Sequence, residues 1–86
     1  MVGQANEEHV IRVSLTLKGF LKNYFEREET SELECPKGSS VQDVLNQAAI
    51  PLNMVSTVTV NGEIKSLEHI LCGDDHLIVY PLVIGG

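Results

Sequence analysis

Apolar and polar residues alternate over residues 9–18 and again over residues 30–35. This is the period of a β-strand with one buried face, so we expect two strands that pair with each other. Between them, apolar side chains from Phe20 to Phe25 recur at helical spacing, which predicts a short helical segment before the charged residues 26–29.

The next pattern is that of an amphipathic helix. Ser40 is placed to cap its N-terminus after a break at residues 36–39, and Asp43 lies in its first turn, near the positive end of the helix dipole. We expect Ile50-Pro51 to end the helix, because proline cannot donate the next backbone hydrogen bond. The apolar positions share one face of this helix: Val41, Val44, Leu45 and Ala48.

The second half of the chain returns to short strands and turns. Asn61-Gly62 is the pair most suited to a tight type I′ hairpin. The other predicted elements are strands at residues 57–60, 63–65 and 76–82, an apolar turn at 67–71 and a reverse turn at 73–75.

Two strands, one helix and three further strands predict an α+β domain, with the helix on one face of a mixed sheet of four to five strands. We expect the final strand to lie at the centre of the sheet. The domain should span residues 9–82, preceded by a disordered N-terminal tail (1–8) and followed by a flexible C-terminal tail (83–86).

The final strand is apolar on both faces, although only one face can pack against the helix. If Leu77 and Val79 point inward, Ile78 and Tyr80 remain on the open face of the sheet. An exposed apolar patch of this kind is a candidate interface, with Tyr80 as its anchor.

A second interpretation of Tyr80 is that the chain's own loop covers it, through Phe20 or Tyr24. Residue type alone does not separate this interpretation from a partner interface, because a tyrosine ring suits both environments.

Composition and charge narrow the function. Of the 86 residues, 43% are hydrophobic and 21% charged, as in folded domains. A net charge of −6 with six scattered basic residues argues against nucleic-acid binding and favours a basic protein partner.

No stretch has the roughly 20 apolar residues of a membrane span, so we expect a cytoplasmic protein. The acidic side chains are most simply a solvated face, and the alternative is a surface complementary to a basic activating enzyme: Glu26, Glu28, Glu29, Glu32 and Glu34.

Catalytic and metal-binding patterns are absent from the sequence. Cys35 and Cys72 stand alone, so we expect two free thiols, and His9, His69 and His76 lack ligand spacing. No nucleophile elbow or phosphate-binding loop is present. We therefore expect a carrier or binding protein and not an enzyme.

The sequence ends with Leu82-Val83-Ile84-Gly85-Gly86. Two glycines make a slim, pliable tail that can enter a narrow channel and present its carboxylate to an enzyme. Such a carboxylate can attack the α-phosphate of ATP, and a sulfur nucleophile can convert the acyl adenylate to a thiocarboxylate at Gly86. The alternative is an ordinary frayed chain end.

The stretch from Val60-Asn61-Gly62 through Tyr80-Pro81 to Gly85-Gly86, with an acidic turn before the last strand, resembles the ThiS/MoaD family of sulfur carriers. This resemblance implies a β-grasp (ubiquitin-like) fold, a free monomer and no permanently bound cofactor. It also implies an E1-like adenylating enzyme that uses ATP and magnesium, a sulfur donor, and a sulfur-accepting partner, either the molybdopterin synthase large subunit or thiazole synthase. Within the resemblance, Gly86 is the thiocarboxylate position, Gly85 its pliable neighbour, and Ile78, Tyr80, Pro81 and Val83 the partner contact.

Two departures from the family pattern matter. Gly73-Asp74-Asp75 replaces the common Asp-Gly-Asp turn, and bulky Ile84 replaces a small residue, which leaves the activating enzyme open. The connection at residues 20–29 resembles the molybdopterin branch more than the thiamin branch, which favours a small subunit of molybdopterin synthase. Two alternatives remain: a modifier joined through Gly86 to protein lysines, and a noncovalent interaction module that uses Ile78 and Tyr80.

Overall fold

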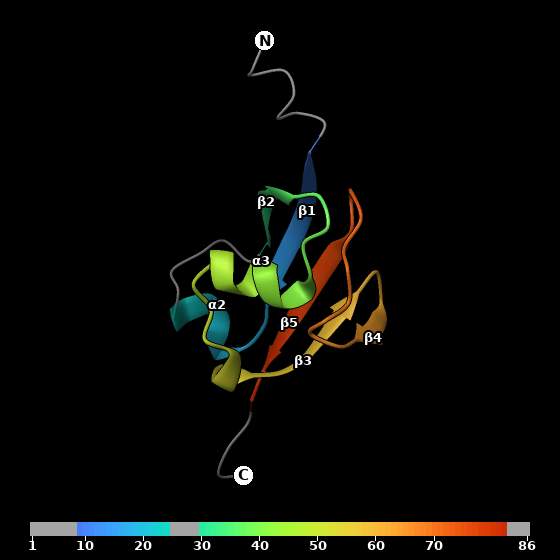
Figure 1. Cartoon of the computed structure of the whole chain (residues 1–86). Coiled ribbons are helices and arrows are strands. Elements are labelled where there is room, and N and C mark those ends of the chain that lie inside the picture. The colour runs from blue at the N-terminus through green and yellow to red at the C-terminus, as the bar shows by residue number, and fades with distance from the viewer. Residues whose placement is uncertain (1–8, 25–29, 83–86) are drawn as a thin grey trace.

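The computed structural model describes residues 9–24 and 30–82, so the expected tails at 1–8 and 83–86 lie outside the described residues. Figure 1 shows the arrangement of the elements. In chain order they are β1 (Val10–Leu17), α2 (Phe20–Tyr24), β2 (Thr30–Pro36), α3 (Val41–Gln47), the 3₁₀ turn η1 (Leu52–Met54), β3 (Val55–Val60), β4 (Glu63–Lys65) and β5 (His76–Pro81).

The described strands form a five-stranded sheet in the order β2-β1-β5-β3-β4. β5 is parallel to β1 and antiparallel to β3, and all other neighbouring strands are antiparallel. Helix α3 crosses one face of this sheet (Figure 1). The predicted mixed α+β sheet, with the final strand at its centre, is confirmed.

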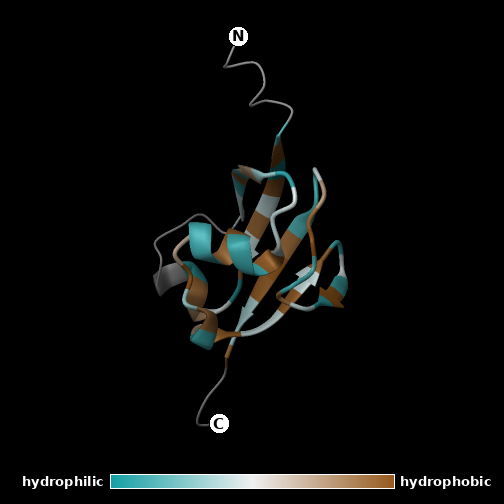
Figure 2. Cartoon of the chain, viewed as in Figure 1, coloured by the Kyte–Doolittle hydropathy of each residue, from teal (hydrophilic) through white to brown (hydrophobic). Residues whose placement is uncertain are grey.

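The core lies between α3 and the sheet. Leu77 and Val79 of β5 are fully buried, as the alternation predicted. Figure 2 shows the period of a half-buried strand as alternating brown and pale bands along β1, whereas β5 carries Leu77, Ile78 and Val79 in succession and is apolar on both faces. The rest of the core comes mainly from β1 and α3, with buried side chains at Val13, Leu15, Leu17, Val41, Val44 and Leu45.

The start of α3 follows the prediction. Ser40 Oγ accepts a hydrogen bond from the Asp43 N–H at 3.1 Å, and Asp43 Oδ2 accepts one from the Ser40 N–H at 3.0 Å. This reciprocal capping box satisfies backbone donors that the first helical turn otherwise leaves unpaired.

The predicted end of α3 at Ile50-Pro51 was wrong, because the helix stops at Gln47. Ala49 has a φ of 63°, in the left-handed region, and so cannot continue the helix. The Ala49 N–H donates to the Asn46 carbonyl at 3.0 Å, and the Ile50 N–H donates to the Leu45 carbonyl at 2.9 Å. These are the bonds of a Schellman motif, so local backbone geometry ends the helix before the proline.

Three smaller differences concern strand ends and turns. β3 begins at Val55, two residues before the predicted start at Thr57, and it directly follows η1, which was not predicted. β2 continues through Pro36, a residue tolerated there because β2 is an edge strand. Ile70, expected in an apolar turn, is 54% exposed. The hairpin prediction was correct, since Asn61 and Gly62 both have positive φ, as a type I′ turn requires.

Candidate functional site

The end of β5 determines where the chain leaves the sheet. Pairing with β1 ends at Leu17 opposite Val79, whereas pairing with β3 continues to Val55 opposite Pro81. The Leu82 N–H then donates to the Met54 carbonyl at 2.9 Å. The backbone is therefore held against β3 up to Pro81 and against the last residue of η1 at Leu82.

Gly19 packs against Pro81, the residue at which β5 ends and the chain leaves the sheet. We call this place the exit point. Gly19, at the turn between β1 and α2, has a φ of +59°, and a Cβ built on it would lie 2.8 Å from Pro81 Cγ. Both the backbone conformation and the close approach favour glycine here. The turn after β1 thus contacts the last residue of β5 directly.

The open face of β5 carries the predicted contact residues. Ile78 is half-buried between Thr16 of β1 and Thr59 of β3, its partners in register. Tyr80 is 38% exposed and lies opposite Thr57. The predicted orientation of Ile78 and Tyr80 is confirmed.

Exposed apolar side chains gather around the exit point. Tyr80 on β5, Leu82 just after it and Phe20 beside Gly19 all remain exposed, and we call these three residues the exit patch. Tyr80 keeps 38% of its surface exposed, so the chain's own loop does not cover it fully, and the Tyr24 side chain lies outside the described residues. A role of the exit patch in partner binding stays a prediction.

The other half of the open face, on β1 and β2, is polar. Arg12 Nη2 lies 3.1 Å from Glu34 Oε2, and Arg12 Nη1 lies 3.9 Å from Glu32 Oε1. These side chains are mostly exposed, so the pairs add little stability. Next to them, the Thr16 hydroxyl lies 2.8 Å from both Thr30 Oγ1 and His76 Nε2.

The acidic turn before β5 is built around a buried carboxylate. Asp75 Oδ1 accepts a hydrogen bond from Asn61 Nδ2, and Asp75 Oδ2 accepts one from the Cys72 N–H, both at 2.8 Å. Asn61 Oδ1 in turn accepts the His76 N–H at 3.0 Å. The left-handed position of this turn falls on Asp74, with a φ of 69°. The departure from Asp-Gly-Asp therefore leaves a well-bonded turn that ties the hairpin to the start of β5.

The structure thus brings Ile78, Tyr80 and Pro81 together at the end of the central strand. The other predicted site residues, Val83, Ile84, Gly85 and Gly86, lie outside the described residues. The contact between Gly19 and Pro81 was not predicted. A glycine directly after a strand was the available signal, but its partner is distant in sequence.

Other kinds of site find no support in the described ranges. Within residues 9–24 and 30–82, no three His, Cys, Asp or Glu side chains are grouped so that they could hold a metal ion. Cys35 is buried and Cys72 exposed, and both are free thiols. None of the described helices has the length and apolar character to span a bilayer.

Solved structures of ubiquitin-like proteins share this fold. Small archaeal modifier protein 1 of Haloferax volcanii superimposes with a TM-score of 0.73 at 18% identity, covering 85% of this chain and 99% of that one. A putative molybdopterin converting factor, subunit 1, from Pyrococcus furiosus gives 0.69 at 18% identity with the same coverage. Urm1 of Trypanosoma brucei gives 0.68 at 12% identity, covering 90% of this chain and 97% of that one.

These similarities confirm the predicted β-grasp fold and, at the level of the fold, the resemblance to the ThiS/MoaD type of protein. The comparison with curated proteins gave no match. A family model described as Mut7-C ubiquitin matches residues 7–84, which is nearly the whole sequence. The chain therefore belongs to the Mut7-C ubiquitin family.

Proposed function

We propose that this protein is a ubiquitin-like sulfur carrier whose Gly86 carboxylate is adenylated and then converted to a thiocarboxylate. The observation that carries the proposal is the end of β5. The central strand leaves the sheet beside exposed Tyr80 and Leu82, four residues before a Gly-Gly end. An activating enzyme can grip the exit patch while the slim tail enters its active site.

The chemistry needs only a free carboxylate on the carrier. A Gly86 carboxylate oxygen attacks the α-phosphorus of ATP and releases pyrophosphate, with magnesium held by the activating enzyme. Hydrosulfide or an equivalent donor then attacks the acyl carbon and displaces AMP, which leaves the thiocarboxylate. The carrier itself contributes binding and reach, and we expect this reaction in the cytoplasm.

The acceptor we propose is a molybdopterin-synthesising partner in preference to a thiazole synthase. One of the similar structures carries the name of a molybdopterin converting factor subunit, which supports this choice. On this proposal the chain acts as the small subunit of a molybdopterin synthase, and its thiocarboxylate is consumed by the large subunit.

Intact-mass spectrometry tests the proposal. The chain is incubated with an E1-like enzyme, ATP, magnesium and sulfide, and we expect the mass gain of one oxygen replaced by sulfur. A chain lacking Gly86 and a chain extended by one alanine after Gly86 serve as controls, because neither presents the Gly86 carboxylate. An unchanged mass with every E1-like enzyme of the source organism would refute the carrier function.

A second candidate is a modifier joined through Gly86 to lysines of other proteins. The printed name of the small archaeal modifier supports it, since that protein shares the fold. Denaturing gels separate the two functions: conjugates resist denaturant and reductant, whereas a carrier leaves no ladder. If the intact chain shows neither charging nor conjugation, and its partner binding persists after removal of Gly85 and Gly86, a noncovalent interaction module is the function.

A further inference from the structure

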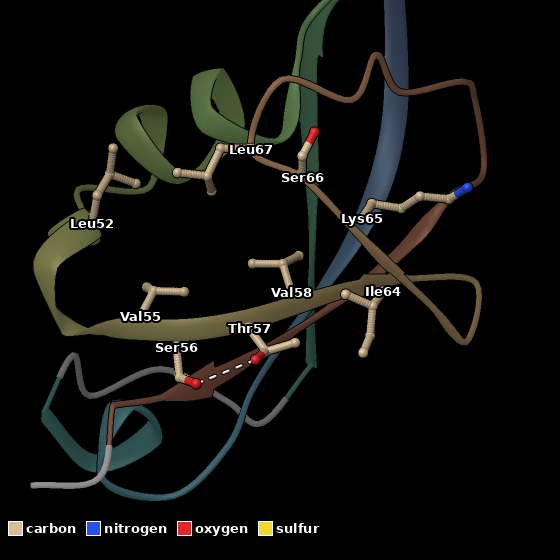
Figure 3. Close-up of a pocket in the computed structure, with 9 residues that line it drawn as sticks. All are labelled: Leu52, Val55, Ser56, Thr57, Val58, Ile64, Lys65, Ser66 and Leu67. Atoms are coloured by element: carbon tan, nitrogen blue, oxygen red, sulfur yellow. Dashed lines mark hydrogen bonds between the residues drawn. The ribbon is translucent and has the colours of Figure 1, made fainter.

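A hollow of about 220 Å³ lies at the outer edge of β3, on the side of that strand opposite β5 (Figure 3). We call it the edge groove. Its main lining residues are Leu52, Val55, Val58 and Leu67 on the side toward α3, and Thr57 and Ile64 on the opposite side.

The groove exists because β4 covers only half of the edge of β3. β4 pairs with Val58–Val60, whereas β3 begins at Val55. After β4 the chain turns away toward α3, where the Leu67 carbonyl accepts the Gln42 N–H at 2.9 Å. Within the described residues, the outer edge of β3 from Val55 to Thr57 therefore has no strand partner.

Figure 3 shows how side chains flank this open edge. Val55 and Val58 point to the same side of β3 as Leu52 and Leu67, while Thr57 and Ile64 point to the other side. A strand laid along the edge would place successive side chains alternately on these two sides. The shape of the groove is therefore that of a site for an extended backbone.

We propose that the edge groove binds an extended, apolar peptide segment of a protein partner, which adds to β3 in line with β4. Backbone pairing with an open strand edge, together with pockets for alternate side chains, is a common mode of peptide recognition. The hollow is larger than the roughly 150 Å³ cavity that admits benzene, so it accepts one large aliphatic or aromatic side chain.

Features of the edge restrict what can bind. A β-bulge lies between Val55 and Thr57, and Lys65, paired with Glu63 at 3.3 Å, borders the far end. Bulges and edge lysines protect sheets against indiscriminate pairing. The added segment is therefore short, and the apolar side chains must supply much of its affinity.

A substitution of Ile64 can test peptide binding to the edge groove without disturbing the fold. It is 76% exposed, so the fold gains little from its burial. An added strand would cover it. This inference does not rest on the proposed sulfur chemistry, because Phe20, Tyr80 and Leu82 do not line the groove, although Thr57 of the groove pairs with Tyr80 across β3 and β5.

Selection from a library of linear octapeptides displayed on phage, against the whole chain, tests the proposal. Selected peptides are synthesised and titrated into the ¹⁵N-labelled protein. We expect saturable shifts of the Val55–Thr57 and Ile64 amide signals. Peptides N-methylated at alternate residues should lose at least tenfold in affinity, since they cannot complete the backbone pairing.

Two matched variants give the control. Ile64→Lys should lower peptide affinity at least fivefold, whereas Ile70→Lys, also at an exposed isoleucine but outside the groove, should change it less than twofold. No enriched peptide, equal affinity of the N-methylated peptides, or shifts confined to Ile78 and Tyr80 would overturn the proposal. So would concentration-dependent dimerisation through Val55–Thr57, which would assign the groove to a second copy of the chain.

Discussion

Ala49 occupies a backbone conformation that costs an L-residue energy. Its φ of 63° closes the Schellman motif after α3, and Ile50 next to it is buried in the core. A left-handed conformation costs a residue with a Cβ about 1–2 kcal/mol, and glycine escapes most of that cost. The fold accepts this strain because the motif buries Ile50.

Ala49→Gly should therefore stabilise the protein. We expect a gain of about 0.5–1 kcal/mol in the free energy of unfolding, after the extra chain entropy of glycine is subtracted. Urea denaturation measures it. Ala48→Gly is the matched control, because Ala48 has a φ of −84° and should only lose stability. A loss of stability in Ala49→Gly would contradict the strain.

The buried hydroxyl of Thr59 is a second residue-level feature that lowers the stability of the fold. Its Oγ1 is buried and has no hydrogen-bond partner within the described part of the chain. Its neighbours in register are Ile78 and Ile64. A buried hydroxyl without a partner costs about 1–3 kcal/mol, so an apolar group of the same shape suits this position better.

Thr59→Val should accordingly raise the free energy of unfolding by about 1 kcal/mol. Thr16→Val is the control: Thr16 has the same shape, but its hydroxyl bonds to Thr30 and His76, so stability should fall. Thermal unfolding followed by circular dichroism compares the two. If both variants change the free energy of unfolding equally, the hydrogen bonding of the two hydroxyls does not determine their effect on stability.

At the scale of elements, Asp75 holds the β3–β4 hairpin and the start of β5 together. Asp75→Ala leaves the Cys72 N–H and the Asn61 amide without their acceptor. We expect a loss of about 1–3 kcal/mol in the free energy of unfolding. Hydrogen exchange of the Cys72 and His76 amides should speed up in the same variant.

Asp74 provides the comparison for Asp75. It is exposed and has positive φ, so Asp74→Gly should be neutral or slightly stabilising. If both substitutions destabilise equally, the turn depends on its local conformation and not on the Asp75 carboxylate.

The elements that the sequence predicted well are those specified by local pattern. Alternation located β1 and β2, and the Ser40 cap located the start of α3. The end of α3 was predicted wrongly because Ala49 takes the left-handed conformation after the helix, where glycine is the usual residue and the usual sequence signal. η1 was missed because a single 3₁₀ turn is too short to show a period.

At the scale of the whole molecule, the site could be predicted only in part. Alternation correctly separated the faces of Ile78 and Tyr80. The contact of Gly19 with Pro81 and the bond from Leu82 to Met54 could not be predicted, because they join residues far apart in sequence. The pairing of β4 with only half of β3 could not be predicted either, because it depends on the path of the chain after β4.

Tyr80→Ala tests the exit patch at this scale. If Tyr80 anchors the activating enzyme, its truncation should lower kcat/KM for adenylation roughly thirtyfold, since an interface hot spot contributes about 2 kcal/mol or more. The loss in free energy of unfolding should stay well below the roughly 3–5 kcal/mol of a fully buried aromatic side chain, because Tyr80 is 38% exposed. Ile70→Ala, at another exposed apolar residue, should leave the rate unchanged. Equal rates for all three proteins would remove Tyr80 from the interface.

The parallel pairing of β1 with β5 has a mechanical consequence. Tension applied between the start of β1 and the end of β5 pulls these neighbours in opposite directions along their shared ladder. The hydrogen bonds of the ladder then bear the load together and do not open one after another. An unfolding machine that pulls at these two points meets a shear clamp, whereas one that pulls on the β3–β4 hairpin can peel the sheet from its edge.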